Sequence, residues 1–210
     1  RGVPESTRVE VKNVLNVHNE SLTEKYLGLP SDVGRSKEGC FNYLKHRVWK
    51  HVQGWMEKCL AWSGKEILIS VVHAIPTYSM VVFKLSRCLC QHITSLVHKF
   101  WWESKASERK TTWFSWETMT MPNYKGGGLG LRDIEFFNLA LLARQVWRIS
   151  RTLELLSGKF LRSVYFPNID IMQATLGSSP FQAWWSLVEG KYIFMLGLIH
   201  GIGNRKSTRV

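Results

Sequence analysis

Few residues in this sequence have the type and spacing that catalysis requires. The chain of 210 residues contains three aspartates, Asp32, Asp133 and Asp170, and no two of them are adjacent. Nucleotidyl transfer with two metal ions needs clustered carboxylates. Asp32 falls in a predicted turn, and Asp133 falls at the beginning of a predicted helix. We therefore expect no catalytic residue, no bound metal and no other cofactor in this chain.

A glycine-rich run at 125–130 raises the question of a phosphate-binding loop. A P-loop ends in Gly-Lys-Ser or Gly-Lys-Thr, whereas Gly130 is followed by Leu131 and Arg132. Asp133, at the start of the next helix, would also repel a phosphate from the amide groups there. We interpret the run as a tight turn before a buried helix.

The cysteines and histidines do not have the spacing of a metal site. Cys88, Cys90 and His92 lie two positions apart, and such positions face away from one another on a helix. Structural zinc sites use paired Cys-x2-Cys or similar spacings. We expect these residues, and His73, to be packing or surface residues. Four cysteines in a chain of this length indicate no disulfide framework and favour a reducing, intracellular location.

Basic residues are the strongest indication of a partner. Twenty-eight Lys and Arg stand against 16 Asp and Glu, a net charge of +12, and favour nucleic acid or an anionic membrane surface. Tryptophans that could stack on bases lie between the basic residues, but Trp55 falls on an apolar helix face, so packing is the favoured role for them. Seven basic residues cluster between positions 35 and 65: Arg35, Lys37, Lys45, Arg47, Lys50, Lys58 and Lys65.

The hydrophobic pattern predicts a mainly α fold with a short strand at 25–29. Ser36 is the expected cap of a long helix whose buried face is marked by apolar residues every three or four positions. Gly64 is expected to interrupt the helices, Pro76 to begin a new turn, and Asp133 to cap a further helix. No apolar run reaches the ~18–20 residues that span a bilayer. The buried face is Phe41, Leu44, Val48, Val52, Trp55 and Cys59. Further helices are expected at 4–15, 65–74, 87–102, 133–151, 155–166 and 180–190, and a hairpin at 198–210.

Short segments in a fixed order extend from about residue 24 to the end of the chain. They are KYLGLP at 25–30, VGRSK at 33–37, Trp55, GKEILI at 64–69, AIPTY at 74–78, FWW at 100–102, GGLGLRD at 127–133, FNLALLA at 137–143, YFP at 165–167 and IGN at 202–204. This ordered series resembles the non-LTR (LINE-type) retrotransposon reverse transcriptases of plants, in the region after the palm.

The resemblance implies roles for particular residues. Leu27 and Gly28 match the hairpin that grips the primer end, and the helices that follow resemble the thumb, which holds the RNA–DNA or DNA primer–template duplex. It implies a primer-grip segment at 1–35, a thumb-like helical domain at 36–112 and a linker-like helical region at 113–210. The catalytic palm with its Mg²⁺ would precede Arg1, and a zinc segment would follow Val210. The expected phosphate contacts are Arg35, Lys37, Lys45, Lys50 and Lys65.

Two departures from the family leave alternatives open. The family usually has one more basic residue between Ile69 and Ser70, and the loss of one helical residue turns everything after it by ~100°. Asn204-Arg205 replaces the usual Asn-Gly. The chain is therefore either a polymerase fragment that contacts nucleic acid, an inert retrotransposon remnant, or a basic helical protein at anionic membranes. The nucleus is the expected location for part of an active element, and an organelle is the alternative.

Overall fold

The computed structural model confirms a mainly α protein. It describes residues 5–15, 25–26, 28–30, 37–56, 58, 60–103, 111–122, 124, 127–152, 154–178 and 180–197. The chain divides into two compact units, Arg1–Cys40 and Phe41–Val210. None of the described helices has both the length and the apolar character required to cross a membrane. The three-part division at residues 35 and 112 stays a prediction.

The first unit contains a small hairpin between short helices. Helix α1 (Glu5–Leu15) has the predicted position, and α2 (Lys37–Cys40) ends the unit. Strands β1 (Lys25–Tyr26) and β2 (Leu29–Pro30) are antiparallel, with Tyr26 opposite Leu29. The strand predicted at 25–29 is divided into two, because Gly28 adopts φ 81°, a left-handed conformation that glycine permits, and the chain turns back on itself.

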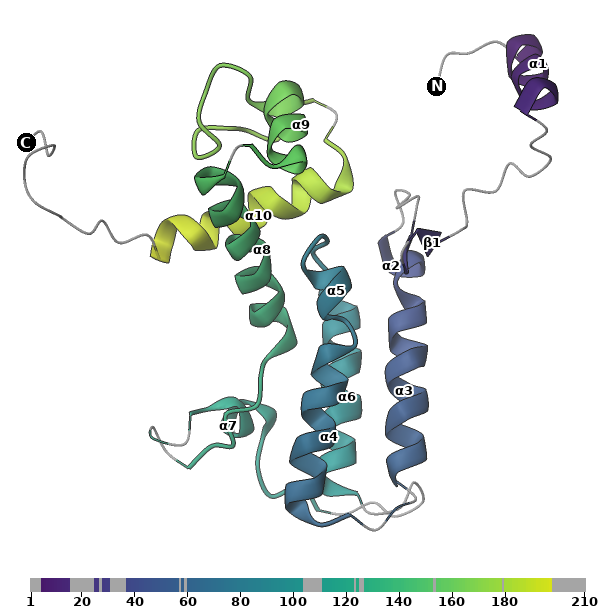
Figure 1. Cartoon of the computed structure of the whole chain (residues 1–210). Coiled ribbons are helices and arrows are strands. Elements are labelled where there is room, and N and C mark those ends of the chain that lie inside the picture. The colour runs from purple at the N-terminus through teal and green to yellow at the C-terminus, as the bar shows by residue number, and fades with distance from the viewer. Residues whose placement is uncertain are drawn as a thin grey trace, which may run out of the picture. The chain divides into compact units, whose positions relative to one another are not determined.

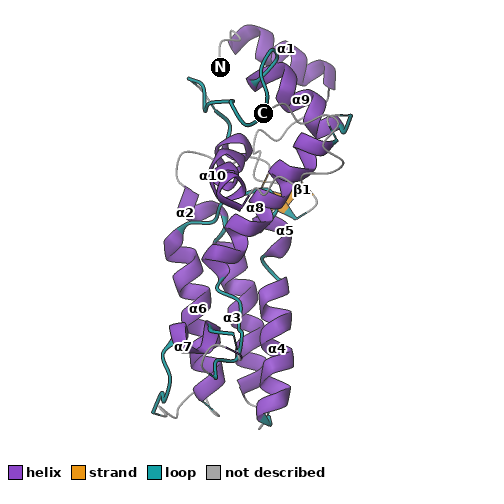
Figure 2. Ribbon diagram, turned by 90° about the vertical axis from the view of Figure 1, so that its left-hand side faces the viewer, coloured by secondary structure: helices purple, strands orange, loops and turns teal. Residues whose placement is uncertain are grey.

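Three helices in the second unit run side by side (Figures 1 and 2): α3 (Asn42–Met56), α4 (Trp62–Ala74) and α6 (Arg87–Trp102). The predicted long helix is interrupted at Phe41, which separates α2 from α3, and its proposed cap, Ser36, lies outside the described residues. The buried face predicted for this helix is confirmed at four positions. At the end of α3, Met56 is the buried residue, whereas Trp55 is only half-buried. The four confirmed positions are Phe41, Leu44, Val48 and Val52.

Helices α4 and α6 complete this bundle. Helix α6 occupies the predicted range, and the Ser86 hydroxyl caps it by accepting from the Leu89 amide at 3.3 Å. Helix α4 begins earlier than predicted, so Gly64 lies in its first turn and does not interrupt it. The predicted turn at Pro76 is confirmed by α5 (Thr77–Met80). The buried residues of α4 and α6 include Ile69, Val72, Leu89, Ile93, Val97 and Phe100.

The second half of this unit contains α7 (Trp116–Thr120), α8 (Ile134–Arg151), α9 (Leu156–Tyr165) and α10 (Gln182–Gly197). The predicted cap of α8 is confirmed, because the Asp133 carboxylate accepts from the amides of Glu135 and Phe136 at 2.9 and 3.1 Å. Helices α8 and α10 cross (Figure 1), around a second core cluster that includes Trp184 and Phe166. The hairpin predicted at 198–210 lies outside the described residues.

Helix α10 extends past its predicted end at Gly190 because of this crossing. A Cβ built on Gly190 would lie 2.6 Å from the Cβ of Leu142, closer than real side chains approach. Glycine therefore allows close contact between the helices and does not end α10.

A buried asparagine joins the two halves of this unit. The Asn138 amide nitrogen donates to the carbonyls of Met80 and Phe83 at 2.8 and 3.0 Å. Its side-chain oxygen accepts from the Leu85 amide at 2.9 Å. Asn138 on α8 thus holds the segment between α5 and α6 with three hydrogen bonds, a role that an apolar helix pattern does not predict.

Candidate functional site

A basic stripe runs along the exposed side of α3. Arg47, Lys50, His51 and Lys58 surround a hollow of about 450 Å³, which Gly54 and Trp55 also line. The spacing of three and four positions places Arg47, Lys50, His51 and Gly54 on one side of the helix axis, away from the core face, and Lys58 lies just beyond the end of α3 at Met56. Helix α3 contains no Asp or Glu, so no carboxylate on this helix neutralises the stripe.

Gly54 gives the hollow its open floor. A Cβ built on Gly54 would meet no atom within 4 Å. Glycine inside a helix costs about 1 kcal/mol relative to alanine, and packing does not require it at this position. Because Gly54 has no side chain, a ligand can approach the backbone of α3 between Arg47 and Lys58.

The structure places the predicted site residues in different surroundings. Lys50 belongs to the basic stripe. Lys45 is also exposed on α3 but does not line the hollow, because five positions of a helix turn it by about 140° from Lys50. Gly28 lies in the hairpin of the other unit. Leu27, Arg35 and the side chain of Lys37 lie outside the described part of the chain.

Lys65 requires a correction. Its side chain is 7% exposed, and its ammonium group donates to the carbonyls of Trp101 and Glu103 at 2.7 and 3.1 Å. These carbonyls lie at the end of α6, where helical partners are missing and a cation is favourable. Lys65 is therefore a buried helix-capping residue and not an exposed phosphate contact.

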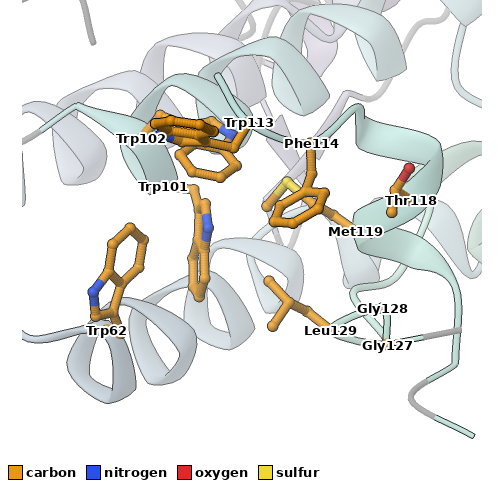
Figure 3. Close-up of a pocket in the computed structure, with 10 residues that line it drawn as sticks. All are labelled: Trp62, Trp101, Trp102, Trp113, Phe114, Thr118, Met119, Gly127, Gly128 and Leu129. Atoms are coloured by element: carbon orange, nitrogen blue, oxygen red, sulfur yellow. The ribbon is translucent and has the colours of Figure 1, made fainter. Parts of the chain in front are cut away.

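A pocket lined by aromatic rings lies beside the end of α6 (Figure 3). It has a volume of about 280 Å³, and five of its lining residues are Trp or Phe. Trp62, Trp113 and Phe114 are 58%, 77% and 58% exposed. Packing was the favoured role for the tryptophans between the basic residues. Trp49 is 46% exposed, and Trp62 combines ring contacts to Trp101 and Trp102 with its exposed surface. The five aromatic residues are Trp62, Trp101, Trp102, Trp113 and Phe114.

The glycine run forms one wall of this pocket and confirms the predicted tight turn. Gly127 and Gly130 have positive φ values of 79° and 63°. The amides of Leu129 and Leu131 donate to the Met119 carbonyl at 3.1 and 3.2 Å, and the Gly130 amide donates to the Met121 carbonyl at 3.0 Å. These amides are therefore committed to the turn after α7 and do not point at a bound phosphate.

Two Arabidopsis thaliana proteins are similar to the chain. The first, "Uncharacterized mitochondrial protein AtMg00310", is 39% identical over 137 residues, which are 65% of the chain and 89% of that protein. The chain belongs to the family of this mitochondrial protein. The second, "Putative ribonuclease H protein At1g65750", is 30% identical over 116 residues, which are 55% of the chain and 18% of that longer protein. No protein-family model and no solved structure matches the chain.

The cysteines of this member of the AtMg00310 family have separate surroundings. Cys90 faces the core, and burial raises the pKa of its thiol to about 12, with the carboxylates of Glu135 and Asp133 adding to the shift. Cys88 is exposed, and its sulfur lies 3.6 Å from Nδ1 of His92. Cys88 and Cys90 thus face away from each other, as predicted. Within the described ranges, no group of three or more His, Cys, Asp or Glu side chains is placed to hold a metal ion.

Of the predicted phosphate contacts on and near α3, Lys50 lines the hollow, whereas Lys45 and Lys65 do not. Arg47 and Lys58, which also line it, belong to the predicted basic cluster but were not among the expected phosphate contacts. A helical projection of positions 47, 50, 51 and 54 indicates the part of the stripe that lies on α3. The aromatic pocket had no such signal, because residues of four separate segments form it.

Proposed function

We propose that the chain is the thumb-and-linker part of a LINE-type reverse transcriptase and that it binds a primer–template duplex through the basic stripe of α3. The arrangement of Arg47, Lys50, His51 and Lys58 around an open hollow carries this proposal, since no carboxylate is among the described residues that line the hollow. The ordered resemblance to LINE-type enzymes supports it. The name of the ribonuclease H relative also suits a nucleic-acid partner.

The stripe suits the phosphate backbone and not the base edges. Arg47 to Gly54 spans about 10 Å along the helix at about 1.5 Å per residue. Cations on both sides of Gly54, Arg47 and Lys50 on one side and Lys58 on the other, can contact successive phosphates, which positions a duplex without reading its sequence. The open backbone at Gly54 lets a sugar–phosphate chain approach the helix between them. Binding of this kind weakens as salt concentration rises.

The chain acts in this proposal as a binding part and not as an enzyme. Three dispersed aspartates cannot form a two-metal centre, so Mg²⁺ and catalysis would belong to a palm supplied by other sequence. The mitochondrial name of AtMg00310 favours an organelle over the nucleus as the location of this chain.

The test is a salt series of duplex binding, measured by fluorescence anisotropy with the full chain. The variant Arg47→Ala/Lys50→Ala/Lys58→Ala should bind an RNA–DNA duplex on the order of tenfold more weakly. The slope of log affinity against log salt concentration should become less negative by about 2 to 3. Each of the three lost phosphate contacts lowers the magnitude of this slope by about 0.9.

A matched variant separates the stripe from overall charge. Lys45→Ala/Arg148→Ala/Arg162→Ala removes three exposed cations elsewhere. Each variant has 28 − 3 = 25 basic and 16 acidic residues, a net charge of +9. The control should keep most of the affinity and slope. Equal losses in both variants would reject the stripe and favour a remnant that binds any polyanion without a site.

A further inference from the structure

The aromatic pocket exposes more ring surface than packing requires. Trp113 and Phe114 are 77% and 58% exposed, and Trp62 is 58% exposed on the opposite side (Figure 3). Trp101 and Trp102 are buried behind them and fix Trp62, with ring centroids 5.2 and 6.2 Å away. The result is a set of rings held partly in place with their faces open to solvent, which suits a flat aromatic ligand.

Adjoining hollows connect this pocket with the basic stripe. A second hollow, of about 320 Å³, shares Trp55 and Lys58 with the hollow on α3 and is also lined by Ala61 and Lys65. Ala61 precedes Trp62, which lines the aromatic pocket, and the buried Lys65 ammonium lies 5.4 Å from the Trp62 ring centroid. A strand whose phosphates contact Lys58 can therefore reach the aromatic rings through this second hollow.

Among the described residues, few acidic side chains lie along this path. Glu103 lines the second hollow, but its carboxylate lies 3.6 Å from the Lys99 ammonium. Glu117 is exposed on α7, near the other end of the pocket. With a net charge of +12 for the chain, a polyanionic occupant fits this surface better than an apolar protein segment does.

The size and polarity of the pocket also limit the occupant. A volume of about 280 Å³ lies just below the roughly 300–1,000 Å³ of most small-molecule sites, which suits one planar ring system. Two polar side chains that line the pocket already have partners. The Thr118 hydroxyl lies 3.0 Å from the Ser115 hydroxyl, and the Trp102 indole donates to His98 at 3.2 Å. Recognition would thus depend on stacking and would tolerate any base.

We propose that the aromatic pocket binds an unpaired nucleobase of a strand whose phosphates follow the basic stripe of α3. The inference rests on the proposed function and adds to it a single-stranded segment next to the duplex. Stacking on aromatic side chains is tolerant of sequence because every base has a π-face. The pocket would therefore hold the unpaired end of a template or primer.

The experiment compares three labelled RNA–DNA duplexes with the full chain. One duplex is blunt, one has a short single-stranded overhang, and one has the same overhang built from abasic sites. We expect the natural overhang to strengthen binding by about 5- to 100-fold over the blunt duplex, the range for one stacked base. The abasic overhang, which keeps the phosphates, should give little of this gain.

Variants of the exposed rings assign the gain to the pocket. Trp113→Ala/Phe114→Ala should remove the preference for the natural overhang and leave blunt-duplex affinity unchanged. Trp113→Tyr/Phe114→Tyr should restore it, whereas Trp113→Leu/Phe114→Leu should not. The control Phe136→Ala/Tyr192→Ala, which truncates two exposed rings elsewhere, should change neither affinity. Thermal melting checks that each variant is folded.

The outcomes separate this inference from the duplex proposal. Equal affinity for natural and abasic overhangs, or an overhang preference that survives Trp113→Ala/Phe114→Ala, overturns the base-binding pocket. Tryptophan fluorescence that does not change when the overhang binds would also overturn the base-binding pocket. An apolar protein segment would then be the favoured occupant of the pocket. In either case, the Arg47→Ala/Lys50→Ala/Lys58→Ala variant still tests the stripe on blunt duplex independently.

Discussion

Lysines of this chain have two different roles that residue type does not distinguish. Lys50 is exposed in the basic stripe, whereas Lys65 donates to two carbonyls at the end of α6. Lys191 repeats the second role, with hydrogen bonds of 3.1 and 2.6 Å to the carbonyls of Met172 and Ala174, and burial lowers its pKa. A cluster of basic residues in a sequence therefore contains structural cations as well as binding ones.

The two roles predict opposite effects of substitution. Lys65→Met should lower the free energy of unfolding by about 2–4 kcal/mol, since two carbonyls lose a charged donor. It should leave the salt slope of duplex binding unchanged. Lys50→Ala should weaken binding and leave unfolding within about 0.5 kcal/mol. Urea unfolding and anisotropy titrations measure both quantities, and a stable Lys65→Met protein with a flatter salt slope would restore Lys65 as a phosphate contact.

His73 makes the stability of the fold depend on pH. It is 5% exposed on α4, and within the described part of the chain its Nε2 has no hydrogen-bond partner. Desolvation lowers its pKa from 6.5 to about 4, Arg132 adds to the shift, and Asp133 opposes it. The folded state thus keeps His73 neutral at pH values where the unfolded chain binds a proton. Its stabilising contribution is complete above pH 6.5 and is lost as the pH falls toward 4.

We predict that the free energy of unfolding decreases by roughly 3 kcal/mol in total across this window because of His73. Most of the decrease should be visible before carboxylates titrate. His73→Gln should flatten the pH profile between about 6.5 and 5, where the unfolded histidine is the group that titrates. The exposed His92→Gln should leave the profile unchanged. Urea unfolding at a series of pH values measures the slope, and identical profiles for the two variants would contradict the assignment.

At the scale of elements, Asn138 holds two helical segments together. Its three hydrogen bonds satisfy the Leu85 amide and the carbonyls of Met80 and Phe83. Asn138→Leu has a similar volume but leaves these three groups without partners in the interior. We expect a loss of about 3 kcal/mol or more in unfolding free energy, because each unsatisfied buried group costs about 1–3 kcal/mol. The exposed Gln173→Leu is the matched control. Equal unfolding free energies of the two variants would show that the three Asn138 hydrogen bonds do not stabilise the fold.

Elements with a strong local signal were predicted from the sequence. The range of α6 and the cap of α8 depend on periodicity and on one side chain next to its own helix. Elements that depend on distant residues were not predicted. The sequence predicted that a helix ends at Gly190. In the structure, Gly190 on α10 instead contacts Leu142 on α8, where the two helices cross. The aromatic pocket was missed for the same reason, since Trp62 and Trp113 meet only in the folded chain.

At the scale of the whole molecule, charge alone does not distinguish a binding site from a merely basic chain. Twenty-eight Lys and Arg are present in the folded and in the unfolded state. A polyanion that recognises only this charge binds both states and shifts the unfolding equilibrium little. A ligand that needs the stripe of Arg47, Lys50 and Lys58 on an intact α3 binds the folded state alone. Stability measured with and without duplex therefore reports on the site itself.

We predict that saturating duplex raises the free energy of unfolding by about 2.7 kcal/mol at a free concentration of about 100 times Kd. The Arg47→Ala/Lys50→Ala/Lys58→Ala variant should show about half of this increase, about 1.4 kcal/mol, at the same duplex concentration, because its tenfold weaker binding leaves the duplex at about 10 times Kd. Lys45→Ala/Arg148→Ala/Arg162→Ala, with the same net charge, should keep most of it. Thermal melts at increasing duplex concentration measure the shift. A chain without a cooperative melt, or one that duplex does not stabilise, would behave as an inert remnant, because a selected interface must favour the folded state.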